Sequence, residues 1–154
     1  VLTRAQNYNI PARTFNRHEF YETDEILNFL TEKGINWIVL AGFLWLVPEN
    51  IVDSFTNRII NIHPALLPKF GGKGMYGLNV HRAVIENKEK ETGITIHYVN
   101  KIYDDGNIIF QTKCKVDEAD TPESLAEKVH KLEYSYYPEI IEKLIIESAG
   151  RLNH

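Results

Sequence analysis

The sequence predicts an α/β fold with a doubly wound, mostly parallel sheet that ends in an antiparallel pair of strands. Residues 37–42 are a continuous apolar run, which is typical of a strand covered on both faces, and the β-branched Ile59, Ile60 and Ile62 indicate a second, central strand. A helix-length segment lies between them, and a strand, a helix and a strand within about 25 residues indicate a right-handed βαβ unit. Residues 93–99 and 108–116 alternate in polarity and are separated by a turn signal, so they are expected to pair antiparallel.

The other elements follow from helix caps, chain breakers and helical periodicity. A helix is expected to end near Asn7, a short strand to cover residues 12–15, and a loop or single turn to cover residues 16–21. Further helices are expected over residues 24–33, over residues 49–55 and from Asn79. A last helix begins at Asp120, and Pro138 is expected to kink it or split it after Tyr137.

Composition narrows the class of protein. A chain of 154 residues, 44% hydrophobic and 25% charged, is expected to form one domain over residues 1–154. The net charge of −4 argues against a nucleic-acid partner, and no apolar run has the length of a membrane span. The single cysteine, Cys114, excludes a disulfide framework and favours the cytoplasm. The protein is expected to be a monomer or a homodimer.

The most informative stretch is residues 59–69, where a β-branched strand runs into a loop bounded by Pro64 and Pro68. Asn61 and His63 are two apart, so on a strand they point to the same face. They lie near the strand's carboxyl end, where open α/β sheets bind ligands. An amide and an imidazole can both donate to an oxygen that gains charge during acyl transfer, and histidine exchanges protons near neutral pH. By itself, however, an Asn-x-His pair is more often a satisfied polar pair.

Four other segments have more than one interpretation. The apolar stretch 43–47 is either core filler or the wall of a ligand cleft, and the glycine-rich stretch 70–77 lacks the phosphate-binding patterns and is either a surface loop or a lid. Asp104 and Asp105 are either turn residues, which is the more common case, or functional carboxylates, and Glu133 is by default a solvated helix residue. His63, His81 and His97 suggest a metal site but lack close ligand spacing, so no metal is expected.

Taken in order, several of these segments resemble the phosphoribosylglycinamide formyltransferase family over essentially the whole chain. Residues 61–69 are similar to the family's Asn-Ile-His-Pro-Ser-Leu-Leu-Pro signature, with Ala65 in place of serine. The other matches are Leu40-Ala41-Gly42-Phe43, then Gly93-x-Thr95-x-His97-x-Val99 followed by Asp104, and finally Glu133 followed by Tyr137-Pro138. Asp105 replaces a glycine that commonly follows the aspartate, and Trp45 stands where many relatives carry arginine.

The resemblance implies a formyltransferase fold and a catalytic trio of Asn61, His63 and Asp104. It implies formyl transfer from 10-formyltetrahydrofolate, the cosubstrate, to the amine of glycinamide ribonucleotide, a small-molecule partner, in purine synthesis. No metal is implied. Glu133 would contact the ribonucleotide. The folate would be bound by Trp45, Leu46, Val47, Val52, Asn61 and Asp104.

Family members begin with a strand and a phosphate-binding loop that nothing in this sequence matches, because its first glycine is Gly34. The sequence is therefore expected to be an N-terminally truncated form, with glycinamide ribonucleotide binding weakened at the phosphate. Two alternatives stay open. One is another enzyme that uses 10-formyltetrahydrofolate, either methionyl-tRNA formyltransferase or a hydrolase. The other is a catalytically inert, folate-binding fragment.

Overall fold

The structure is a computed structural model that describes residues 2–151, in two compact units divided between Ile35 and Asn36. The first unit holds three helices, α1 (Leu2–Asn7), α2 (Arg17–Tyr21) and α3 (Glu25–Glu32). Asn16 and Glu19 form a capping box at the start of α2.

The strand expected over residues 12–15 is wrong, because that segment has no regular structure. Its side chains pack against the helices of the same unit instead. The Arg13 guanidinium bonds Glu25 at 3.2 Å and lies 5.0 Å from the centre of the Phe29 ring, and Phe15 stacks on Phe20. The first unit contains no described strand that could supply the ladder hydrogen bonds that a strand needs.

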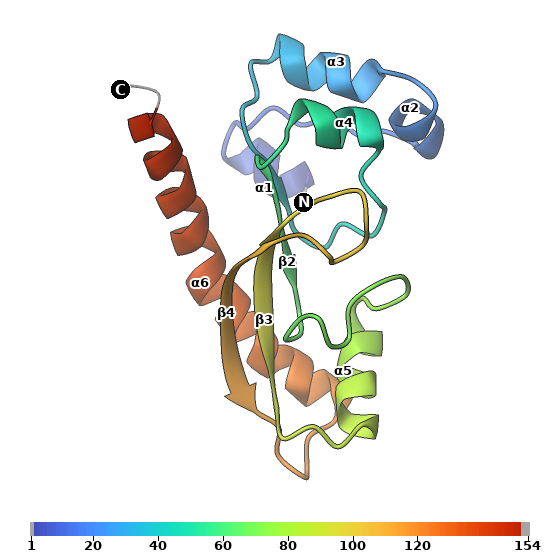
Figure 1. The fold of residues 1–154 in the computed structure, drawn as a ribbon, viewed down its shortest axis with the longest axis vertical. Coiled ribbons are helices and arrows are strands. Elements are labelled where there is room, and N and C mark those ends of the chain that lie inside the picture. The colour runs from blue at the N-terminus through green and yellow to red at the C-terminus, as the bar shows by residue number, and fades with distance from the viewer. Residues whose placement is uncertain (1, 152–154) are drawn as a thin grey trace. The chain divides into compact units, whose positions relative to one another are not determined.

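The second unit is a four-stranded sheet in the order β1-β2-β3-β4 (Figure 1). Its strands are β1 (Ile38–Leu40), β2 (Ile59–His63), β3 (Glu91–Tyr98) and β4 (Ile108–Lys115). Its helices are α4 (Glu49–Ser54), α5 (Leu78–Glu86) and α6 (Pro122–Arg151). The α/β class, the β1-α4-β2 unit with parallel strands and the antiparallel pair β3–β4 are confirmed.

The expectation of a mostly parallel sheet needs correction for the described strands. β1 and β2 are parallel, whereas β2 pairs antiparallel with β3, and β3 pairs antiparallel with β4. The reason is the path of α5. This helix carries the chain onward past the end of β2 instead of back along the sheet, so β3 starts at the end where β2 stops (Figure 1). The alternating polarity of residues 93–99 predicted a strand but not its direction relative to β2.

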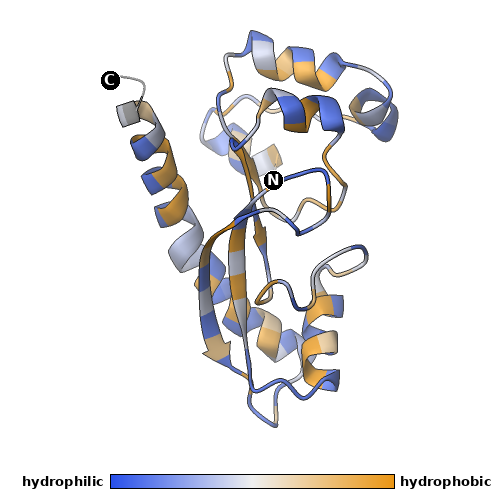
Figure 2. Cartoon of the chain, in the orientation of Figure 1, coloured by the Kyte–Doolittle hydropathy of each residue, from blue (hydrophilic) through white to orange (hydrophobic). Residues whose placement is uncertain are grey.

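The hydrophobic core lies between one face of the sheet and α6. Six buried residues form the centre of this core. Apolar and polar residues alternate along the helices and strands, so each element can turn apolar side chains inward (Figure 2). The central residues are Ile60, Ile62, Ile94, Ile96, Val129 and Tyr137. No helix within residues 2–151 is long and apolar enough to cross a membrane.

Helix α6 runs through Pro138 without a break, so of the two outcomes expected there, a kink or a split, the split is wrong. A proline inside a helix removes the hydrogen bond to the carbonyl four residues earlier, here that of Tyr134. Tyr134 is 78% exposed, so water can take the place of the lost donor. Tyr137 and Ile140, on either side of the proline, both pack on the core, and α6 bends about half-way along its length (Figure 1).

The Tyr137 hydroxyl ties α6 to the two parallel strands. It donates to the Leu40 carbonyl at 2.7 Å, and the Ile60 carbonyl lies 3.3 Å away. The ring is buried, and this burial raises the pKa of Tyr137 well above its ordinary value. The hydroxyl is therefore a permanent donor between β1 and β2.

We predict that Tyr137→Phe lowers the free energy of unfolding by about 1–2 kcal/mol, because it removes a buried donor and leaves its acceptors under-satisfied. Urea unfolding measures this change. Tyr134→Phe is the matched control, because that side chain is exposed on the same helix, and it should leave the midpoint unchanged. Equal effects of the two substitutions would contradict the assigned role of the hydroxyl.

Candidate active site

The register between β2 and β3 collects four polar residues on one face of the sheet. Asn61 lies opposite His97, and His63 lies opposite Thr95. The isoleucines that alternate with them face the core beneath α6. His63, Thr95 and His97 are at most 3% exposed, so this polar block is buried. Buried polar groups require partners, which explains the bonds described next.

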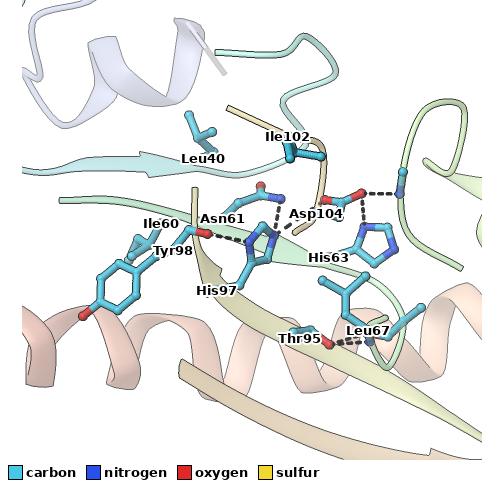
Figure 3. Close-up of polar contacts among 12 residues, drawn as sticks. Leu40, Ile60, Asn61, His63, Leu67, Thr95, His97, Tyr98, Ile102 and Asp104 are labelled. Carbon is cyan, nitrogen blue, oxygen red and sulfur yellow. Dashed lines mark hydrogen bonds and ion pairs between the residues drawn. The ribbon is translucent and has the colours of Figure 1, made fainter. Parts of the chain in front are cut away.

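Asp104 joins the block from the loop that connects β3 and β4. Its carboxylate oxygens lie 3.5 Å from Nδ1 of His63 and 3.6 Å from Nε2 of His97 (Figure 3). Its backbone has φ of +52°, and the N–H of Gly72 donates to Oδ2 at 2.9 Å. The loop passes so close to β3 that a Cβ on Gly106 would lie 1.7 Å from the Tyr98 carbonyl oxygen, so only glycine fits there.

His97 connects Asn61 to this carboxylate. Its Nδ1 donates to the Tyr98 carbonyl at 2.8 Å, because a carbonyl can only accept. In the neutral ring Nε2 is then an acceptor, and the Asn61 amide donates to it at 3.2 Å. An amide group has two hydrogens, and within residues 2–151 nothing is bonded to the second one. Asn61 thus has a hydrogen available for a ligand.

The ring of His63 is oriented by the loop that follows β2. Nε2 donates to the Phe70 carbonyl at 2.7 Å, so the proton of the neutral ring lies on Nε2 and Nδ1 faces Asp104. Burial lowers the pKa of His63 below its ordinary value, although the Asp104 carboxylate and the Phe70 carbonyl oppose this shift. Nδ1 is therefore the nitrogen that can take up and return a proton.

Asp104 stays ionised in spite of its surroundings. Burial would raise the pKa of this carboxyl group. The His97 ring, the His63 ring and the N–H of Gly72 outweigh burial and hold the pKa below its ordinary value. A carboxylate beside an imidazole favours the imidazolium whenever a proton reaches the ring. The site can therefore present an amide N–H and an imidazolium N–H to one developing oxyanion.

The structure brings together Asn61, His63 and Asp104, the three residues proposed as catalytic. It favours Asp104 over Asp105, whose exposed carboxylate accepts from the Asn100 side chain at 3.1 Å. The role of the trio in catalysis stays a prediction.

Four of the six predicted folate residues lie in the segment before α4 or in α4 itself, and the other two, Asn61 and Asp104, belong to the polar block described above. Val47 and Val52 are 5% and 8% exposed, while Trp45 and Leu46 are half-buried. The Trp45 ring meets Phe43 edge-on at 6.2 Å.

Glu133 lies on α6, and its side chain is 23% exposed. Its carboxylate is 3.9 Å from Nε2 of His130, and burial raises the pKa of Glu133. Its partial burial in α6 differs from the solvated position that its place in the sequence suggested.

Sequence reasoning did not place His97 and Thr95 among the site residues, although both complete the polar block. The signal was present, because Thr95-x-His97 repeats the two-residue spacing of Asn61-x-His63 on a second strand. The antiparallel pairing of β2 with β3 was not predicted, so the two pairs were not placed opposite one another. Within the described residues, no three His, Cys, Asp or Glu side chains form a group able to hold a metal.

Comparison with known proteins identifies the family and the fold. Residues 1–141 match the family model described as formyl transferase. The chain belongs to the formyl transferase family. A protein named phosphoribosylglycinamide formyltransferase, chloroplastic, from Arabidopsis thaliana is 42% identical over 142 residues, which cover 89% of this chain and 49% of that relative. The chain therefore spans about half the length of this plant protein.

Bacterial relatives are covered more fully. The phosphoribosylglycinamide formyltransferase of Bacillus subtilis is 35% identical, with 94% of this chain and 74% of that protein covered. The crystal structure of the enzyme of the same name from Anaplasma phagocytophilum aligns with a TM-score of 0.84 at 37% identity, with 96% of this chain and 69% of that one covered. The formyltransferase fold is thereby confirmed.

We predict that Asp104→Asn lowers the pKa of His63 further, because the carboxylate is the main influence opposing the effect of burial. The neutral ring should then persist to lower pH than in the unsubstituted protein. Titration of the His63 ring by NMR measures this shift. Asp105→Asn, an exposed neighbour with the same change of charge, should leave the midpoint near its original value. An unchanged or raised midpoint in Asp104→Asn would contradict the electrostatic account.

Proposed function

We propose that this protein transfers the formyl group of 10-formyltetrahydrofolate to the amine of glycinamide ribonucleotide in purine biosynthesis. Membership of the formyl transferase family and the shared name of its relatives support the reaction. The observation that carries the proposal is the buried cluster in which Asp104 lies 3.5 Å from His63 and 3.6 Å from His97, with Asn61 hydrogen-bonded to His97.

The chemistry follows from the roles of the side chains. The substrate amine attacks the formyl carbon, a C–N bond forms, and the carbonyl oxygen becomes an oxyanion. The second hydrogen of the Asn61 amide and Nδ1–H of the His63 imidazolium donate to this oxygen. The bond to the folate nitrogen then breaks. The proton that the amine loses passes through the carboxylate of Asp104, or a water beside it, to the departing nitrogen.

The binding residues are proposed on the same basis. The folate would lie against Val47 and Val52, with backbone contacts from residues 45–47, where buried apolar side chains make a suitable wall for a pterin ring. Glu133 would contact the glycinamide ribonucleotide. A partly buried carboxylate of raised pKa suits an amine or amide partner. A cytoplasmic location and a monomeric or homodimeric state stay predictions.

The experiment is a formyl-transfer assay on the chain encoded by the complete open reading frame. We predict that His63→Ala and Asn61→Ala each lower kcat by about 100-fold or more, since each removes a donor to the oxyanion. Asp105→Asn, which lies in the same loop as Asp104 but points to solvent, should retain most of the activity.

Three results would reject or redirect the proposal. Transfer to a different acceptor, or hydrolysis of the formyl group, would support another enzyme that uses 10-formyltetrahydrofolate. Folate binding without turnover would support the inert fragment. Full activity in His63→Ala would show that the cluster is not the reaction centre.

A further inference from the structure

Thr95 occupies the fourth corner of the polar block and uses its hydroxyl completely. Its Oγ1 donates to the Ala65 carbonyl at 2.7 Å, and it accepts from the Leu67 N–H at 2.9 Å and from the Gln111 amide at 2.8 Å. A hydroxyl has one hydrogen and two lone pairs, so no further bond is possible. The side chain is fully buried. Thr95 thus anchors two backbone groups of the loop that leaves β2.

Gln111 reinforces this anchor from the edge strand β4. Its register position is directly opposite Thr95. Both hydrogens of its amide are used, one for Thr95 and the other for the Leu67 carbonyl at 2.9 Å. The residue is exposed, yet its amide nitrogen reaches inward across the neighbouring strand. The Leu67 peptide groups are therefore held on both sides.

The loop that Thr95 and Gln111 hold in place, residues 65–72, also contacts the candidate catalytic side chains. The Leu67 side chain packs against Gly71 so tightly that a Cβ at Gly71 would lie 2.5 Å from Leu67 Cδ2. On either side of Gly71, the Phe70 carbonyl accepts from His63 and the Gly72 N–H donates to Asp104. A shift at Leu67 would consequently move the Phe70 carbonyl, which fixes the His63 ring, and the Gly72 N–H, which fixes the Asp104 carboxylate.

We propose that Thr95 and Gln111 are a positioning pair, which holds residues 65–72 so that Phe70 orients His63 and Gly72 orients Asp104. The link to catalysis rests on the proposed formyl transfer. Neither side chain touches the reacting atoms, so both act through the loop. The pair fixes which nitrogen of His63 carries the proton of the neutral ring. Nδ1 is thereby kept facing the carboxylate.

The test compares two pairs of variants. Thr95→Val keeps the shape but removes the hydroxyl, and Thr95→Ser restores it. Gln111→Met removes the amide at an exposed position, so it carries little risk to folding, and Lys113→Met is its control two residues along the same strand. Each variant is measured for kcat and KM in formyl transfer, and its His63 ring is followed by ¹⁵N NMR for tautomer and titration midpoint.

We expect Thr95→Val to lower kcat by about tenfold or more, because small displacements of catalytic groups cost one to two orders of magnitude. KM should change much less. The NMR signal of a proton fixed on Nε2 of His63 should weaken in Thr95→Val and Gln111→Met. It should persist in Thr95→Ser and Lys113→Met, whose kcat should stay near that of the parent chain.

Two outcomes would overturn the proposal. One is an unchanged His63 tautomer in Gln111→Met together with an unchanged kcat. The other is a Thr95→Val protein that loses stability while its His63 spectrum stays the same, which would mean a structural role only. The NMR measurement needs no turnover. If the parent chain transfers no formyl group, the proposed function fails while the spectra still decide whether the pair positions His63.

Discussion

The antiparallel register of β2 against β3 is the constraint on which the rest of the site depends. It sets Asn61 opposite His97 and His63 opposite Thr95, and it sends the intervening isoleucines to the core under α6. A shift of one residue would turn the polar block into the core and the isoleucines outward. The apolar contacts with α6 therefore stabilise the arrangement of the polar face, although none of them takes part in the chemistry.

The polar face is tolerated because nearly every buried group on it has a partner. The Phe70 and Tyr98 carbonyls each fix a proton on one imidazole ring, and Asp104 lies between the two rings. Burial favours a neutral His63, whereas the ionised carboxylate favours a protonated one. These opposing effects keep the ring able to change its charge during a reaction. A site of apolar residues would be easier to bury but would have no such capacity.

The sequence was informative where local pattern determines structure. The strand through Asn61 and His63, the β1-α4-β2 unit and the β3–β4 pair could all be predicted, because periodicity and turn signals act over short distances. The direction of β3 relative to β2 could not, since it depends on where α5 carries the chain. His97, Thr95 and Gln111 were missed for the same reason, as their contacts cross strands. Whether Pro138 kinks the helix or splits it could not be predicted either, because packing on both sides of the proline keeps α6 continuous.

The most direct test of the account is a crystal structure of the protein with an unreactive analogue of 10-formyltetrahydrofolate. The account predicts that the analogue's carbonyl oxygen lies within hydrogen-bonding distance of the Asn61 amide nitrogen and Nδ1 of His63. Nε2 of His63 should still donate to the Phe70 carbonyl, as it does in the present structure. An analogue bound with its carbonyl oxygen away from both residues, or a His63 ring turned so that Nδ1 no longer faces Asp104, would contradict it.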